Sequence, residues 1–428
     1  MTDVIYHVDS QHTLQMSRPS PKFVYRFLTV LLLLVGLIAA GCRPPQNIAE
    51  MPLENKATPE ILPTEPEPEQ DITFVLRTID ESFGTVERDT YGNIIGVDLA
   101  AGRTSATDAV LKLALTLPNL KKFRLAGGTI SAEAFAGLKL QTNLEELFLQ
   151  DMSIRDDEFL SVVSALPNLK RLTLRRLSNV SDVGMIPLFQ LPALRQLALI
   201  EMPLTGAGLQ NVDDTVTLTA FDVRDCAQLV PEDYKHLLRL PKLVDLKIGG
   251  FAINDQCLEI IAQLPALKGL TLDDTMISAK GFETFATDSL SADTLETLVL
   301  NRNMALTDDA LVALGNFPRL RRIILGDAMV TGTFIVRLAE EEQKRPKFND
   351  IALRKTFLTE EAMDSFKQYP ELQSLQITGI VLSREGIDIL LSLSSLERLD
   401  LTDCFLDEEA LRHLQGAELP MSLKVLKY

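Results

Sequence analysis

The sequence predicts an α/β solenoid, in which short parallel strands alternate with helices that cover one face of the sheet. Two observations predict this fold. The pattern L-x-x-L-x-L recurs at intervals of 24 to 28 residues from Leu120 onward. Between the copies, apolar residues recur at helical spacing and often end in an "LP" pair, as in "INDQCLEIIAQLPAL".

An uncharged run at residues 27–41 lies before the repeats. It is shorter than the ~20 residues that a bilayer-spanning helix needs. Three positive residues precede it: Arg18, Lys22 and Arg26. This pattern is typical of a signal peptide. The ending Ala-Ala-Gly-Cys resembles the lipobox of bacterial lipoproteins, which implies that Cys42 is lipidated and becomes the mature N-terminus. An uncleaved N-terminal membrane anchor is the alternative.

Residues 43–71 combine prolines with glutamates, as in "PTEPEPEQ". Such a segment buries little apolar surface and stays extended. We therefore expect residues 1–41 to be the signal peptide and residues 42–71 to be a flexible spacer. The protein is then expected in the cell envelope, facing the periplasm or the cell surface. The sequence leaves open which membrane carries the anchor, and whether Met1 or Met16 is the true start.

Residues 72–93 follow a different pattern and are expected to form an N-terminal cap. We predict a helix over residues 72–82, a strand over "GTVERD" and a turn over "YGN". The cap would shield the first core layer of a repeat domain at residues 94–428.

About thirteen repeats fill that domain. They start at Ile94, Leu120, Leu144, Leu169, Leu194, Leu218, Leu243, Leu267, Leu295, Leu320, Phe348, Leu372 and Leu396, with a partial copy at Leu423. These units resemble the leucine-rich repeat family, and within it the ribonuclease-inhibitor-like and cysteine-containing subclasses. The resemblance implies a horseshoe with a parallel β-sheet on the concave face and helices on the convex face. Because one strand and one helix cannot bury an apolar face alone, stacking must supply the core.

The resemblance also accounts for the cysteines. Cys226 and Cys404 lie eight residues past the start of their motifs, where the family places an inward-facing Asn, Cys or Thr that satisfies loop backbone. Other units have Thr275, Asn303 and Thr356 at this place. Cys257 occupies an apolar helix position. We therefore expect three small buried side chains rather than disulfides.

No set of residues is typical of an enzyme. After the spacer only His236 and His413 remain; they lie seven units apart, and each is expected on a helix surface. The sequence has no metal-ligand spacing, phosphate-binding loop or G-x-S-x-G motif. A net charge of −17 disfavours binding to nucleic acid. We expect a non-enzymatic protein without metal or cofactor.

The period of a strand places the third, fifth and seventh residues of each motif on the concave face. The candidate ligand-binding residues there are Lys122, Arg124, Phe148, Arg171, Arg175, Arg224, Lys247, Val299, Arg322 and Ile324. Acids interleave with these cations, as at Glu146, Asp222 and Asp245, and Val299 and Ile324 are expected to form an exposed apolar pair. The alternative is that the charges are solvated and that the apolar pair only supports the strands.

A further acidic column lies eight places into the motifs and is expected in solvated turns. It consists of Asp151, Glu201, Asp225, Asp274, Asp327 and Asp403.

The expected function is the binding of a protein partner along the concave face by a lipid-tethered monomer. A carbohydrate- or cell-wall-binding protein and a structural envelope protein are the alternatives. Sugar sites favour aromatic platforms, whereas the chain has no Trp and only 6% aromatic residues. The sequence does not name the partner, and it leaves open whether the concave or the convex face binds.

Overall fold

The computed structural model describes residues 72–101, 106–128, 130–154, 158–212, 214, 216–406, 408–417 and 419–428. The predicted signal peptide, Cys42 and the spacer lie outside the described residues. The described residues fall within one compact unit, Pro68–Tyr428.

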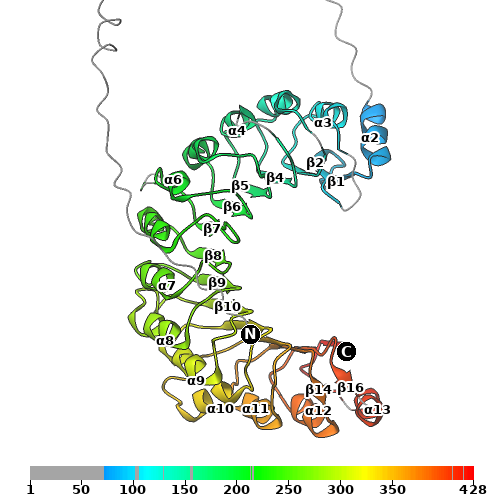
Figure 1. Cartoon of the computed structure of the whole chain (residues 1–428). Coiled ribbons are helices and arrows are strands. Elements are labelled where there is room, and N and C mark those ends of the chain that lie inside the picture. Colours follow the sequence, from blue (N-terminus) through cyan, green and yellow to red (C-terminus); the bar gives the residue numbers. More distant parts are fainter. Residues whose placement is uncertain are drawn as a thin grey trace, which may run out of the picture. The chain divides into compact units, whose positions relative to one another are not determined.

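A parallel sheet forms the inner layer of this unit, and helices form its outer layer (Figure 1). The strands are β1 (Thr85–Arg88), β2 (Ile94–Leu99), β3 (Lys122–Ala126), β4 (Glu146–Gln150), β5 (Arg171–Arg175), β6 (Gln196–Ile200), β7 (Ala220–Asp222), β8 (Asp245–Gly249), β9 (Gly269–Asp273), β10 (Thr297–Asn301), β11 (Arg322–Gly326), β12 (Asp350–Arg354), β13 (Ser374–Thr378), β15 (Arg398–Asp400) and β17 (Val425–Lys427). They follow chain order in a 15-stranded sheet, and only the first pair is antiparallel. The short strands β14 (Val381–Leu382) and β16 (Phe405–Leu406) pair separately.

From β3 onward, each strand of the long sheet starts at the third residue of its L-x-x-L-x-L motif. The register is regular as well, since Leu298 on β10 pairs with Leu270 on β9 and with Ile323 on β11. The predicted leucine-rich repeat solenoid, with a parallel sheet and a helical layer, is therefore confirmed.

The helices are short, and several are 3-10 helices. The α-helices are α2 (Ile72–Glu81), α3 (Asp108–Ala114), α4 (Glu158–Val163), α5 (Asp182–Met185), α6 (Gly206–Leu209), α7 (Asp255–Ile261), α8 (Ala279–Asp288), α9 (Asp308–Leu311), α10 (Thr333–Glu340), α11 (Glu360–Ser365), α12 (Arg384–Leu391) and α13 (Glu408–Gly416). The 3-10 helices are η1 (Ala132–Leu140), η2 (Ile186–Gln190), η3 (Pro231–Arg239), η4 (Val312–Asn316) and η5 (Phe366–Gln368). Such short elements gain most of their stability from packing rather than from helix propensity.

The first elements cover the N-terminal end of the core. Helix α2 buries Val75 and Ile79, which belong to the continuous hydrophobic core. Strand β1 pairs antiparallel with β2 through a turn at residues 89–93. The helix, strand and turn predicted for residues 72–93 are all present.

Polar side chains in the core form hydrogen bonds with the backbone groups of the loops. Asn303 is buried, its amide donates to the carbonyl of Leu272 (2.7 Å), and its oxygen accepts from the backbone N–H of Thr275 (3.2 Å). Cys226 and Cys404 occupy the same place in their units, and their thiols donate to backbone carbonyls at 3.2 Å. The role predicted for this position is confirmed for these three residues.

The same position also shows two departures from expectation. Thr356 is buried, but its hydroxyl makes no hydrogen bond within the described residues. Cys404 is only half-buried, because it lies near the C-terminal end of the sheet, where fewer units cover it. Cys257 is fully buried as predicted, and all three of these thiols are free.

Acids in the first turn of one helix bind the start of the next helix. Asp255 accepts hydrogen bonds from the backbone N–H (2.7 Å) and hydroxyl (2.6 Å) of Ser278. The equivalent pairs are Asp108 with Ser131, Asp182 with Thr205, Asp308 with Thr331 and Glu360 with Ser383. The hydrogen bonds from Ser131 lower the pKa of Asp108. These pairs form a ladder of polar contacts that joins neighbouring units on the helical side.

Most units leave their strand through a residue with positive φ at the eighth place of the motif. These residues are Asp151, Arg176, Glu201, Asp225, Asp274, Arg302, Asp327, Lys355 and Asp403, with φ between 49° and 64°, and Gly127, Gly250 and Gly379. Because aspartate and glycine tolerate this conformation better than most residues, the turn accounts for much of the acidic column. The acids are not only solvated, however: Arg176 bridges Asp151 and Glu201, and Lys355 pairs with Asp327.

Gly281 tests the ladder. A Cβ at this position would lie 2.0 Å from Oδ1 of Asp255, so the carboxylate would have to leave Ser278. We expect Gly281→Ala to lower the free energy of unfolding by about 1 to 3 kcal/mol, although alanine normally favours a helix. Gly416→Ala is the control, because no atom of the described residues lies within 4 Å of its Cβ position. Urea unfolding followed by circular dichroism measures both; equal stability of the two variants would contradict the ladder.

Candidate binding surface on the concave sheet

The ten candidate residues all lie on or beside strands of the long sheet. Nine of them are strand residues of β3, β4, β5, β8, β10 and β11, and Arg224 lies two residues beyond β7. The burial of β3 alternates along the strand, with Phe123 and Leu125 in the core and Arg124 exposed between them. The structure therefore places the third, fifth and seventh motif residues on the concave face.

Most candidate cations on this face are already paired with acids. The pairs are Lys122 with Glu87 (2.8 Å), Arg124 with Asp98 (3.1 Å), Arg171 with Glu146, Arg175 with Glu201 (2.8 Å), Arg224 with Asp222 (2.8 Å) and Asp273 (3.2 Å), and Arg322 with Asp350 (3.1 Å). The two carboxylates beside Arg224 raise its pKa further above its ordinary value. Because nearly every charge has a neighbour of opposite sign, these residues do not form a basic patch.

Two adjoining hollows form a groove along the middle of the sheet. The first, of about 290 Å³, extends from Arg171 on β5 to Lys247 on β8. The second, of about 440 Å³, extends from Asp245 to Ile324 on β11. Asp245 and Lys247 line both hollows, which makes them continuous. We call this surface the concave groove.

Small side chains create the groove. Ala198, Ala220, Gly269 and Thr271 occupy concave positions on β6, β7 and β9. Longer side chains stand at the ends, including Arg171 and Arg322. The groove thus depends on residues with little side chain, which sequence reasoning about charged and bulky residues missed. Small residues at the third or fifth place in the units that begin at Leu194, Leu218 and Leu267 were the available signal.

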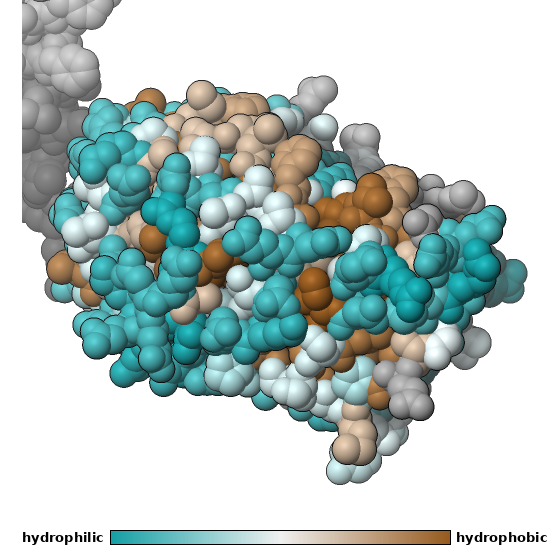
Figure 2. Space-filling view, turned by 90° about the horizontal axis from the view of Figure 1, so that it is seen from below, coloured by the Kyte–Doolittle hydropathy of each residue, from teal (hydrophilic) through white to brown (hydrophobic). Residues whose placement is uncertain are grey.

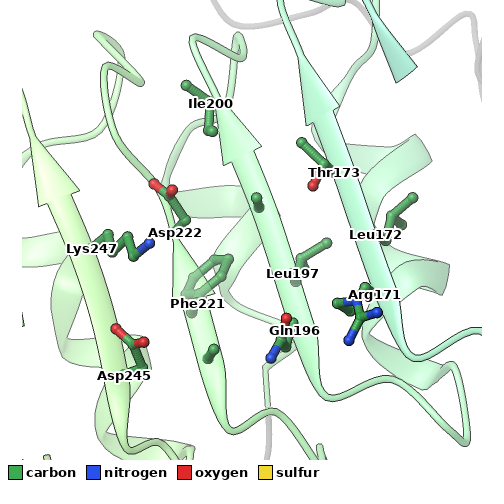
Figure 3. Close-up of a pocket in the computed structure, with 12 residues that line it drawn as sticks. Arg171, Leu172, Thr173, Gln196, Leu197, Ile200, Phe221, Asp222, Asp245 and Lys247 are labelled. Carbon is green, nitrogen blue, oxygen red and sulfur yellow. The ribbon is translucent and has the colours of Figure 1, made fainter. Parts of the chain in front are cut away.

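Asp245 and Lys247 differ from the other charged residues of the groove. Within the described residues, no hydrogen bond or ion pair engages the carboxylate of Asp245 or the ammonium of Lys247. Figure 3 shows Lys247 reaching from β8 toward Asp222 on β7, with Asp245 on the same strand as Lys247. Burial raises the pKa of Asp245; the Lys247 charge opposes this shift, and the Asp222 charge adds to it. The sequence had marked Lys247 as a candidate but Asp245 only as an interleaved acid.

The predicted exposed apolar pair is only partly present. Val299 is half-buried and Ile324 is 8% exposed, so the expectation of an exposed Ile324 is wrong. Ile324 pairs with Val299 on one side and with Ala352 on the other. On the inner side of a curved sheet, neighbouring side chains converge; Thr271 and Ala352 are also buried there. Both apolar residues still line the groove.

The remaining candidates lie outside the groove. Lys122, Arg124 and Phe148 are close together near the N-terminal end, where the Arg124 guanidinium lies 4.3 Å from the centre of the Phe148 ring. Arg175 and Arg224 are seventh-place residues at the edge where the strands end. The structure therefore brings Arg171, Lys247, Val299, Arg322 and Ile324 into one groove and separates them from the other five.

The histidine and cysteine side chains that could take part in catalysis lie outside the concave groove. His236 is buried on η3, between the buried Tyr234 and Leu237, so its predicted place on a helix surface is wrong. Burial lowers the pKa of His236 and raises the pKa of Cys226 to about 12. In the described ranges, no three His, Cys, Asp or Glu residues are grouped so as to hold a metal ion. No helix in those ranges combines the length and the apolar composition required to span a bilayer.

Comparisons with known proteins give the following similarities. No protein-family model matches the chain. The putative F-box/LRR-repeat protein 22 of Arabidopsis thaliana is 31% identical over 146 residues, which cover 32% of this chain and 47% of that protein. The chain thus spans about half the length of this curated relative. The crystal structure of an internalin (inlF) from Listeria monocytogenes aligns with 16% identity and a TM-score of 0.43, over 84% of this chain and 95% of that one.

Asp245 provides a test of the groove. Its raised pKa means that the ionised carboxylate destabilises the folded state at neutral pH. This cost declines as the pH falls below the raised pKa, and it is gone below the ordinary pKa of an unfolded aspartate. We therefore expect Asp245→Asn to raise the thermal unfolding midpoint at pH 7, with a difference that shrinks in acid.

Asp350→Asn is the matched control, because Asp350 occupies the same third place in its unit but pairs with Arg322. This variant should not gain stability. Differential scanning calorimetry across pH 4 to 8 provides the measurement, and a stabilised Asp350→Asn or a destabilised Asp245→Asn at pH 7 would contradict the assignment.

Proposed function

We propose that this leucine-rich repeat protein is a non-enzymatic, lipid-anchored receptor of the cell envelope that binds a protein segment in its concave groove. The observation that carries the proposal concerns Asp245 and Lys247 at the centre of the groove. Within the described residues they make no hydrogen bond or ion pair, whereas most other concave charges there are paired. Residues that are poorly placed for stability are often retained for function.

The groove suits an extended segment with both charge and apolar side chains. A basic side chain of the partner would reach Asp245, and an acidic one would reach Lys247. Both interactions would form in a partly desolvated hollow, where they are stronger than on an open surface. Ile200 and Val299 offer apolar contacts in the two hollows. A ligand of this mixed chemistry is a peptide segment rather than a nucleic acid or a lipid.

The dimensions of the groove agree with such a ligand. It crosses the strands from β5 to β11, and neighbouring strands lie ~4.8 Å apart, so it is roughly 30 Å long. An extended chain advances about 3.3 Å per residue, so a segment of about nine residues would fill it. Regular, rigid strands position the lining side chains and limit the ordering cost of binding.

Carbohydrate binding is the weaker alternative. A sugar site would need free aromatic faces, whereas Phe148, the aromatic candidate on the concave face, lies under the guanidinium of Arg124. The non-enzymatic part of the proposal is supported by Cys226 and Cys257, whose burial raises their pKa and keeps the thiols protonated. A structural envelope role remains the second alternative if no ligand is found.

The binding test is a crosslinking pull-down from the native envelope with the full chain as bait. The variant Asp245→Lys with Lys247→Glu reverses the two charges and keeps the net charge. We expect it to lower recovery of the partner about tenfold or more, because each charge of the partner would then face a like charge in the groove. The control Asp400→Lys with Lys427→Glu makes the same exchange on β15 and β17, outside the groove, and should leave recovery unchanged. Equal recovery by both variants would move the binding site away from the groove.

The anchor is tested separately at Cys42. Metabolic labelling with a fatty-acid analogue should mark the wild-type chain and not Cys42→Ser, and the serine variant should leave the membrane fraction if cleavage releases it. Cys404→Ser is the control, because it also removes a thiol that is not fully buried. Label that persists in Cys42→Ser would exclude Cys42 as the lipid site without affecting the assignment of the groove.

A further inference from the structure

A second surface lies where the strands end, three places beyond the last concave position of each motif. Large apolar side chains stand there in six consecutive units: Met276, Met304, Met329, Phe357, Val381 and Phe405. Phe251 extends this row by one unit, one place earlier in its motif. Their exposed fractions range from 53% for Met329 to 79% for Phe251. We call these seven residues the edge stripe.

The repeat fold does not require large apolar residues at this place. The equivalent residues of earlier units are Ser153, Ser178 and Ala227, which are also exposed. Because small and polar side chains serve the same turn equally well, the change to methionine and phenylalanine in the C-terminal half needs another explanation. Contiguous exposed apolar surface of this size is characteristic of an interaction site.

Members of the stripe are held on ordered backbone. The N–H of Met276 donates to the carbonyl of Ile253 (2.7 Å), and that of Phe357 donates to the carbonyl of Val330 (2.8 Å). Val381 on β14 pairs directly with Phe405 on β16. Figure 2, which views the molecule from below, shows tan and brown apolar residues gathered in a band along the upper border of that face, beside teal hydrophilic residues.

A charged column runs beside the edge stripe, two residues earlier in each unit. It reads Asp274, Arg302, Asp327 and Lys355, with alternating sign. Arg302 pairs with Asp274 (2.5 Å) and Lys355 with Asp327 (3.5 Å), and all four side chains retain contact with solvent. Read in reverse, the order is plus, minus, plus, minus. The column is therefore complementary to a reversed copy of itself.

We propose that the edge stripe binds a second copy of this chain in a two-fold symmetric dimer. An isologous interface brings the same patch of both copies together in opposite directions. With the axis between Arg302 and Asp327, Arg302 faces Asp327 of the second copy and Asp274 faces its Lys355. In the same register Met304 faces Met329 of the second copy. Met276 faces Phe357 of the second copy, which would form a favourable sulfur–aromatic contact.

The curvature of the solenoid permits this pairing. A two-fold axis along the radius of a curved edge maps the curve onto itself with reversed direction. The two stripes can therefore remain in contact along their length, roughly 30 Å at ~4.8 Å per unit. In this arrangement both concave grooves open toward the same side. The edge stripe is separate from the concave groove, so dimerisation and partner binding do not compete.

The exposed apolar area is sufficient for a dimer. Aromatic side chains present about 150 to 250 Å² each when fully exposed, and seven large side chains at these exposures offer on the order of 800 Å². A stable interface buries about 800 Å² per partner. A lipid surface suits the stripe less well, because it would place Asp274 and Asp327 against the membrane. The sequence predicted a monomer. The stripe becomes visible only when the tenth residues of successive units are placed side by side.

The test uses two full-length copies with different affinity tags, expressed together and extracted from the membrane. Capture through one tag should recover the other wild-type copy. Met304→Asp with Met329→Asp in both copies should reduce that recovery about tenfold or more. Leu140→Asp is the control, because Leu140 is also an exposed apolar residue but lies at the end of η1, away from the stripe; it should leave recovery unchanged. Thermal unfolding confirms that each variant is folded.

Charge exchange tests the register independently. Arg302→Asp in both copies, or Asp327→Arg in both copies, places like charges opposite each other and should reduce recovery. One copy of each variant expressed together restores opposite charges across the axis and should restore recovery to the wild-type level. Arginine and aspartate both already occupy this turn position, so the backbone accommodates either exchange.

Recovery of wild-type copies, its loss in the stripe variants and its rescue by the mixed charge variants would together support the dimer. Failure of wild-type copies to recover each other would overturn it. So would the absence of rescue between two folded variants. Stripe variants that still recover each other but no longer bind anionic or zwitterionic vesicles would overturn the dimer and assign the stripe to a lipid surface.

Discussion

Stacking of one unit on the next is the constraint on which the rest of this structure depends. A single strand and helix leave an apolar face open and polar groups unpaired, and only the neighbouring unit can cover both. The structure meets this need on the helical side through pairs such as Asp255 with Ser278, and in the core through Asn303, which binds backbone of the preceding unit. The stability of the domain therefore depends on the interfaces between neighbouring units rather than on one central core.

This constraint divides each repeat into occupied and free positions. The core takes the first, fourth and sixth places, the turn takes the eighth, and in units such as those of Cys226 and Asn303 a backbone contact takes the ninth. Concave places and the tenth place carry no such duty, as the variety of their residues demonstrates: Ala198 and Lys247 both face the sheet's inner side, and Ser178 and Met304 share the edge. The two proposed interaction surfaces lie at these free positions, and they can change without disturbing the solenoid.

Much of the fold could be predicted because its signals are local. The motif beginning at Leu295 predicts β10, and the structure starts that strand at Thr297. The inward role of Asn303 follows from its place in the unit. The site could be predicted only in outline. The sequence predicts that Ile324 is exposed and that His236 lies on a helix surface, but both are buried. Burial depends on packing between units, which the spacing within one unit does not show.

By itself, the sequence determined the repeat, the strand register and the face on which each motif residue lies, since all three follow from periodicity along the chain. Only the tertiary structure decided which charges are paired, where the sheet is hollow and which edge residues form a continuous stripe. The physical reason is that partners such as Arg322 and Asp350 stand 28 residues apart and meet only through strand pairing. Asp245 and Lys247 became distinguishable from the other charges once those partners were in place.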